Sequence, residues 1–366
     1  MQIGYFTPPP FTKRPLSIEA LSGEFGKELH YASKGRNCLF HILQALNVKG
    51  PVLLPVYCCS TVLDAIKRLG LKYFFYDIKE EDCNADFKSI QSLILSKSPD
   101  CVVAVSMYGN PCCLPELECL CKNKGIALID DAAQSVGAEI EGRKVMTFGD
   151  AGFFSLSPGK PFAGHMGAFF WCSQPYSIKY KKRPFLHRLV YEDYLLNRLN
   201  GLKCGIKPIS KVVKKFSSYL QTHVDIAYDG LSVFEEEIIG GIIHDSVIHH
   251  TPLRTELAFE LAELITNNNV FRQILPYKEE NRKGIAHKYI FVCNSIDMAD
   301  SLIDYLNESG IRCQKGYRML SKDLDALPHA KTLDGRIIEI PLDPNREACI
   351  YIAKVMNRFV ESLNQE

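Results

Sequence analysis

Two side chains with complementary chemistry follow apolar runs in the first half of the chain. Asp131 comes directly after the run 126–129 and Asp130, and Lys160 follows the run 152–156 in a loop rich in Ser and Gly. A lysine amine in an apolar site can act as a nucleophile and a base toward a carbonyl carbon. A carboxylate nearby can keep a ring nitrogen protonated, which pyridoxal phosphate (PLP) needs as an electron sink. Loop lysines are commonly solvated and such aspartates commonly cap helices, so these residues alone leave both interpretations open.

The segments around these two residues alternate between strand-like and helix-like patterns. Alternation of this kind predicts β-α-β units and a mostly parallel sheet. The apolar runs are continuous, which indicates that helices cover both faces of that sheet. Ligand groups in such sheets gather beyond the carboxyl ends of the strands, where Asp131 and Lys160 are expected. The predicted strands are 52–55, 73–76, 101–106, 126–129, 152–156 and 168–171, and the predicted helices are 38–46, 61–69, 87–95 and 114–121.

The last third of the chain predicts a small second α/β domain. We expect a large domain over residues 1–270 and a C-terminal domain over 271–366. Gly310 is placed to end a helix of the second domain as a C′ glycine. The predicted strands there are 289–293, 311–314 and 337–340, and the predicted helices are 297–308 and 345–363.

A basic segment interrupts the α/β pattern. Residues 176–220 hold eleven Lys or Arg and two acids, and residues 225–245 hold six acids. We expect a basic helical insertion whose charge the acidic stretch offsets. The alternative is a docking face for anionic lipid, as peripheral membrane contact, or for a phosphorylated substrate.

Composition narrows the class of protein. The 366 residues carry 43 Lys or Arg and 42 Asp or Glu, so no overall charge favours nucleic acid. No apolar run reaches the roughly 18 residues of a transmembrane helix, and the first residues lack a signal-peptide pattern. The 14 Cys show no paired C-x2-C spacing. We therefore expect a cytoplasmic protein with reduced thiols and no metal site.

Two motifs around Asp131 and Lys160 are distinctive. Residues 129–138 read IDDAAQSVGA, and residues 154–160 read FSLSPGK. They resemble the "EDAAQA-GA" and "F-S-F-x-P-T-K" signatures of the DegT/DnrJ/EryC1/StrS family of PLP-dependent sugar aminotransferases, in which the lysine of the second signature binds the cofactor. Weaker likenesses extend over most of the chain, at 54–57, 107–111, 142–152, 254–264, 287–292 and 338–342. The resemblance implies the aspartate aminotransferase-like fold of type I PLP-transferases. Its large domain holds a mostly parallel, seven-stranded sheet, and its C-terminal α/β domain is smaller.

The resemblance also implies roles for individual residues. Lys160 would bind the cofactor aldehyde as a Schiff base, and Asp131 would face the pyridine nitrogen. Gln134 would contact the 3-oxygen of the cofactor, and Ser155 its phosphate. Backbone N–H groups at the start of the first helix suit a phosphate as well. The remaining candidate cofactor contacts are Gly35, Arg36 and Asn37 at that helix start and Tyr57 as the ring-stacking aromatic.

Three positions depart from the family pattern. The loop after the lysine contains His165, the segment whose Asn reaches the partner subunit's phosphate contains Pro252 instead, and the "H-Y" motif near the sugar site begins with Gly316. These changes fit a variant substrate, and they fit weakened activity equally well.

We therefore expect a PLP-dependent aminotransferase that acts on a keto sugar. The family implies a nucleotide-linked sugar for surface polysaccharide or amino-sugar biosynthesis, a glutamate donor and a homodimer. One alternative is a dehydratase-like reaction, although the related dehydratases have histidine in place of Lys160. A second is a non-catalytic regulatory protein with the same fold. A plain nucleotide-binding protein is disfavoured, because the glycine-rich phosphate motifs are absent from the first strand ends.

Overall fold

The protein is described here from a computed structural model. The structure describes residues 17–157, 159–162, 167–177, 233–342 and 345–363. The predicted basic insertion therefore lies outside the described residues except for its first two positions, and so do His165 and the first acids of the stretch 225–245.

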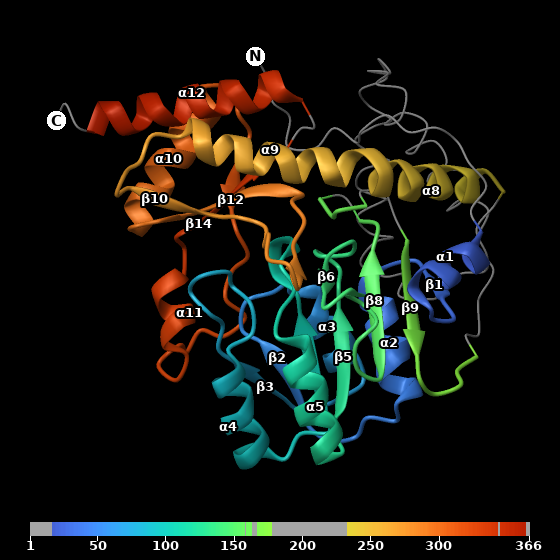
Figure 1. The fold of residues 1–366 in the computed structure, drawn as a ribbon. Helices are drawn as coiled ribbons and strands as arrows, with labels where there is room; N and C mark the ends of the chain where they lie inside the picture. Colours follow the sequence, from blue (N-terminus) through green and yellow to red (C-terminus); the bar gives the residue numbers. More distant parts are fainter. Residues whose placement is uncertain (1–16, 158, 163–166, 178–232, 343–344, 364–366) are drawn as a thin grey trace, which may run out of the picture.

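A seven-stranded sheet forms the first half of the fold (Figure 1). Six of the seven strands run in one direction, and only the second strand from one edge runs the opposite way and pairs antiparallel with both of its neighbours. The mostly parallel sheet predicted from the sequence is thus confirmed. In spatial order the strands are β1 (His30–Ala32), β9 (Ala168–Cys172), β8 (Ala151–Ser155), β5 (Ala127–Asp131), β4 (Cys101–Val105), β2 (Val52–Pro55) and β3 (Tyr73–Tyr76).

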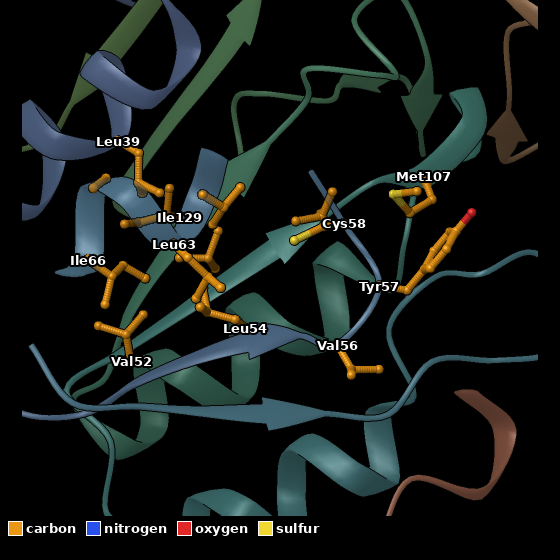
Figure 2. Packing of buried hydrophobic residues seen from close by; sticks show 14 of the residues in the cluster. Leu39, Val52, Leu54, Val56, Tyr57, Cys58, Leu63, Ile66, Met107 and Ile129 are labelled. Atoms are coloured by element: carbon orange, nitrogen blue, oxygen red, sulfur yellow. The ribbon is translucent and has the colours of Figure 1, made fainter. Parts of the chain in front are cut away.

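Helices cover both faces of this sheet. On one face α2 (Gly35–Ala45) and α3 (Thr61–Arg68) pack on alternate strand residues, and Figure 2 shows Leu39 and Ile66 of these helices beside Leu54 and Ile129 of the strands. On the other face lie α1 (Ile18–Phe25), α4 (Phe87–Lys97) and α5 (Leu114–Lys124). Burial of both faces explains why the strand sequences are continuously apolar.

Helix α2 begins three residues earlier than its apolar pattern predicts. Lys34 is extended at the N-cap, and its carbonyl oxygen accepts bonds from the N–H groups of Asn37 and Cys38. The apolar periodicity starts only at Cys38, because the first turn is polar. This difference matters because the early start places Gly35, in the first turn of the helix, beside Ser155 of strand β8.

A second, antiparallel sheet follows in the C-terminal third. Its order is β10 (Phe271–Ile274), β12 (Lys288–Cys293), β14 (Ile337–Pro341) and β13 (Gln314–Lys315). The strand expected at 311–314 pairs with β14 only from Gln314 onward. The pairing extends past the predicted end, because the Gly316 N–H donates to the carbonyl oxygen of Ile337.

The two faces of the second sheet contact different parts of the molecule. One face packs on α9 (Thr251–Leu264), α10 (Ile296–Glu308) and α12 (Arg346–Leu363), and α9 and α12 run side by side (Figure 1). The other face, which includes Ile290 and Ile337, joins the core of the first sheet. The domain boundary at 270 stays a prediction. Leu257 and Leu261 of α9 precede that boundary, yet they lie in the second core.

Short elements complete the fold. They are the 3-10 turn η1 (Met107–Gly109), a three-stranded sheet of β11 (Arg282–Lys283), β6 (Glu139–Ile140) and β7 (Arg143–Lys144), α8 (Val233–Asp245), the π-helical turn η2 (Ser246–His250) and α11 (Pro328–Leu333).

Within the described ranges, no helix is both long and apolar enough to cross a bilayer. The thirteen cysteines in those ranges are free thiols. No group of three or more His, Cys, Asp or Glu side chains is arranged to hold a metal ion in the described part of the chain.

Candidate active site

Asp131 and Lys160 meet at the carboxyl edge of the first sheet. Asp131 ends β5, and the parallel neighbour β8 carries the chain to the turn that contains Lys160. The turn is closed by a hydrogen bond from the Lys160 N–H to the Ser157 carbonyl oxygen, with an N···O distance of 3.2 Å. The positive charge of Lys160 acts on the carboxylate of Asp131 and lowers its pKa. The structure thus brings together the two residues on which the sequence prediction depends.

Burial dominates the electrostatics of Asp131. The residue is 3% exposed, and burial raises the pKa of its carboxyl to about 6. A bond to Oδ1 from the Ala133 N–H, at 2.9 Å, and the charge of Lys160 offset part of this rise. Such a carboxyl gains a strong partner when a cationic ring nitrogen is placed against it.

The adjacent Asp130 has a different environment. Successive strand residues point to opposite faces, so the two carboxyls do not share a site. Asp130 accepts a bond from the Phe148 N–H at 3.3 Å, and burial raises its pKa to about 8. A carboxyl that holds its proton at neutral pH cannot supply a negative charge. We therefore assign the charged role to Asp131.

Gln134 lies just beyond β5, and only the nitrogen of its side-chain amide has a polar contact among the described residues. Its Nε2 is 3.2 Å from the sulfur of Met107. Its Oε1 is buried and has no hydrogen-bond partner among the described residues. An unpaired buried carbonyl oxygen is costly, so this atom is suited to a donor on a bound ligand.

The start of α2 and the end of β8 form a site that fits a phosphate group. A β-carbon on Gly35 would lie 3.4 Å from Cβ and 3.7 Å from Oγ of Ser155. Lys34 provides no side-chain cap, and a helix start without one suits an anion. The side chain of Asn37 is engaged with Ser33, with an Nδ2 to Oγ distance of 2.8 Å, and the Asn37 N–H donates to the Lys34 carbonyl oxygen.

Other predicted contacts are engaged within the protein as well. The hydroxyl of Ser155 donates to Oγ of Ser157 at 3.0 Å. The guanidinium of Arg36 bonds to Asp64 of α3, with Nη1 2.8 Å from Oδ2. The hydroxyl of the buried Tyr57 lies 2.5 Å from that of Tyr108 and accepts the Tyr317 N–H at 3.0 Å. Their roles toward a cofactor, like those of the other predicted site residues, stay predictions.

The structure adds residues that the sequence analysis did not single out as site residues. The charge of Lys160 also acts on the buried Cys58 and on His287, whose ring nitrogens have no hydrogen-bond partner among the described residues. Burial lowers the pKa of His287 well below its usual value, so the ring is neutral. Lys288 and Glu339 form an ion pair beside the Lys160 turn. A signal for this pair existed, because Glu339 is a lone charge inside the apolar strand IIEIP.

The donor set fits PLP. A lysine amine and a carboxylate act on each other across one site, an unpaired amide oxygen lies nearby, and a helix start with a serine hydroxyl suits a phosphate. Fold and site together define an α/β protein of the PLP-binding type. Over its whole length the chain resembles solved aminotransferases: the structure of the aminotransferase TlmJ from Streptoalloteichus hindustanus has a TM-score of 0.75 at 16% identity, covering 99% of this chain and 100% of that one. This likeness confirms the predicted fold.

Sequence comparison finds a family match over part of the chain. Residues 30–174 match the DegT/DnrJ/EryC1/StrS aminotransferase family. A UDP-N-acetyl-3-dehydro-alpha-D-glucosamine 3-aminotransferase of Acidithiobacillus ferrooxidans is 30% identical over 131 residues, 35% of each chain. A GDP-perosamine synthase of Vibrio cholerae is 30% identical over 154 residues, 41% of this chain and 42% of that protein. These matches span about two fifths or less of the relatives' own lengths. The family match over residues 30–174 contains Asp131 and Lys160. The predicted family resemblance is confirmed.

Proposed function

We propose that this protein is a PLP-dependent aminotransferase that acts on a nucleotide-linked keto sugar in surface polysaccharide or amino-sugar biosynthesis. The observation that carries the proposal is that Lys160 lies close enough to the buried Asp131, at the carboxyl edge of the sheet, for its charge to lower the pKa of that carboxyl. The names of the two relatives, one for a UDP-linked sugar and one for a GDP-linked sugar, support the substrate class.

Each residue has a task that its position allows. PLP supplies an electron sink for deprotonation of the carbon that bears the amine. Lys160 holds the cofactor through its Nζ and, once released, moves a proton at that carbon as base and then acid. Asp131 keeps a proton on the ring nitrogen. Ser155 and the N–H groups at the start of α2 bind the phosphate, and the free Oε1 of Gln134 orients the ring substituents.

Two further parts of the proposal come from the family resemblance: glutamate is the amino donor, and the active unit is a homodimer. A third part, a cytoplasmic location, comes from the cysteines, which the sequence analysis interprets as reduced thiols. Sedimentation of the purified protein tests the dimer: a monomer at micromolar concentration contradicts it.

Lys160 also bears on the alternatives. A dehydratase-like reaction in this family is associated with histidine at the lysine position, so an amine at 160 favours transamination. A non-catalytic regulatory role predicts cofactor binding without turnover. The altered Pro252 and Gly316 positions motivate that alternative.

Absorbance measurements test the function. Wild-type protein mixed with PLP should show a visible band near about 420 nm that survives dialysis, from the bond between Lys160 and the cofactor. Borohydride reduction and peptide mass mapping should place the pyridoxyl group on Lys160. Glutamate should bleach the band, and a nucleotide-linked keto sugar should restore it.

Two lysine variants show whether the absorbance band depends on Lys160. Lys160→Ala should lose the band on dialysis, whereas Lys331→Ala, at an exposed lysine paired with Asp325, should keep it. A colourless wild-type protein refutes the cofactor proposal. A band that neither glutamate nor other amino acids bleach refutes transamination and favours the regulatory alternative.

A further inference from the structure

A buried ion pair joins two strands of the second sheet. Lys288 Nζ lies 2.6 Å from Glu339 Oε2, and the two side chains are 12% and 2% exposed. Gln314 of β13 donates to the same oxygen at 3.2 Å. Both members of the pair are thus largely removed from water, and the carboxylate is held by more than one donor.

Strand register directs this pair toward the first sheet. Glu339 lies opposite Ile290 of β12 and opposite Gln314 of β13. Lys288 is two residues before Ile290 and therefore shares its face. Ile290 belongs to the core of the first sheet, so the ion pair faces the first sheet and its carboxyl-edge loops.

A chain of hydroxyl groups links the carboxylate to those loops. Tyr108 donates to Glu339 Oε1 at 3.2 Å. Tyr57 must then donate to Tyr108, because the single proton of Tyr108 is already used, and Tyr57 accepts the Tyr317 N–H. Tyr108 has a left-handed backbone, with φ at +53°. This conformation is uncommon for a tyrosine and is found more often at functional sites.

The other end of the pair touches the turn that carries Lys160. A β-carbon on Gly159 would lie 3.7 Å from Cε and 4.0 Å from Nζ of Lys288. The groups around Lys160 come from several elements. They are Asp131 at the end of β5, Cys58 after β2, His287 just before β12, Arg254 of α9, which donates to the carbonyl oxygen of Pro161, and Lys288 of β12, which pairs with Glu339 of β14.

A buried ion pair is a poor stabilising device, because desolvation of two charges offsets their attraction. Its position beside the Lys160 turn suggests another role. We propose that Lys288 and Glu339 are a positioning pair for Lys160, which fixes its turn against the second sheet and balances the charge around its amine. This inference rests on the proposed role of Lys160 as the cofactor-binding lysine.

The two members have opposite effects on the amine. Without the Glu339 charge, Lys288 places an unpaired positive charge beside Lys160 and disfavours the protonated, unreactive amine. Without the Lys288 charge, the remaining carboxylate favours the protonated amine. When both charges are removed, the net charge that the pair places beside the Lys160 amine is again zero, as in the wild type. A merely structural pair would not produce effects of opposite sign.

Chemical labelling of the protein without cofactor tests the proposal. The probe is acetic anhydride at pH 8, and peptide mass spectrometry reads the rate at Lys160 relative to the exposed Lys331. We expect Glu339→Gln to label Lys160 at least about threefold faster than wild type and Lys288→Met at least about threefold slower, for charges in a partly desolvated site. The double variant should label within about twofold of wild type.

Two controls complete the design. Lys288→Arg keeps the positive charge, so its Lys160 should be labelled at the wild-type rate. A comparison of Lys288→Arg with Lys288→Met therefore tests the effect of the charge even if Glu339→Gln fails to fold. Glu260→Gln removes one acid from an exposed pair with Arg346 and should change nothing. The proposal is overturned if both single variants shift the rate in the same direction, or if neither differs from Glu260→Gln.

The PLP absorbance of the same proteins gives a separate result. Lys288→Met and Glu339→Gln should shift the pH midpoint of the visible band in opposite directions. A wild-type protein that binds no PLP refutes the proposed function, while the labelling rates still decide the role of the pair.

Discussion

Gly316 lies directly against the hydroxyl oxygen of Tyr57, so closely that a β-carbon at position 316 would overlap with it. The same β-carbon would lie 2.9 Å from the hydroxyl of Tyr108. The glycine at this position, where the family has a histidine, is therefore a steric requirement of the tyrosine pair. In this chain the hydroxyl groups of Tyr57 and Tyr108 occupy the space that a side chain at 316 would need.

A double-mutant cycle tests this requirement. Gly316→Ala should lower the free energy of unfolding by about 2 kcal/mol, because the buried tyrosine must move. Tyr57→Phe alone should cost about 1 kcal/mol through its lost hydrogen bonds. The double variant should cost at least about 1 kcal/mol less than the sum, since the overlapping oxygen is gone. Urea unfolding measures all four proteins.

Gly23→Ala is the matched control. Gly23 lies inside α1, and a β-carbon added there would have no atom within 4 Å, so alanine should raise the free energy of unfolding by about 0.5 kcal/mol or more. Strictly additive effects of Gly316→Ala and Tyr57→Phe would contradict the steric account.

Ser155 should bind the phosphate group of the cofactor. Its hydroxyl lies beside the start of α2, so Ser155→Ala should weaken PLP binding about tenfold, the effect of one charge-assisted hydrogen bond. Binding of pyridoxal, which lacks the phosphate, should change less than twofold. Spectrophotometric titration with both ligands measures the two affinities. An equal loss for both ligands would show that the serine acts on the fold of the loop instead.

Arg36 should contribute little to the same site. Its guanidinium is engaged by Asp64, 2.8 Å away, and the pair is partly exposed. Arg36→Met should therefore change PLP affinity less than about twofold and the free energy of unfolding by less than about 1 kcal/mol. Ser155→Ala serves as the positive control in the same titration. A tenfold loss of affinity for Arg36→Met would establish the phosphate contact predicted from the sequence.

Much of the first sheet could be predicted because its strands are short, continuously apolar and separated by periodic helices. The ends of β5 and β8 placed Asp131 and Lys160 near each other without any knowledge of tertiary contacts. The two-residue strands, such as β6 and β7, were missed because they hold too few residues to show a period.

The ion pair of Lys288 and Glu339 could not be placed from the sequence. The two residues are 51 positions apart, and only the pairing of β12 with β14 puts them on one face. The engagement of Arg36 by Asp64 depends in the same way on how α2 packs against α3. Such partners follow from tertiary packing, which local sequence patterns do not encode.

Asp131 should make the stability of the cofactor-free protein depend on pH. Its pKa is raised from 3.8 to about 6, so between these values the folded protein holds a proton that the unfolded chain releases. The free energy of unfolding therefore falls as pH rises through this window. Between pH 5 and 7.5 this one residue lowers the free energy of unfolding by about 1.4 kcal/mol.

The variant Asp131→Asn should lack this decrease in the free energy of unfolding, and urea unfolding at both pH values measures it. All other titratable groups are present in both proteins, so the difference between the two proteins reports on the carboxyl at position 131. Asp325→Asn, at a fully exposed carboxyl, should leave the difference between the two pH values unchanged. An identical fall in wild type and Asp131→Asn would mean that the carboxyl at the end of β5 is already ionised at pH 5, and that Lys160 compensates its burial more fully than its surroundings indicate.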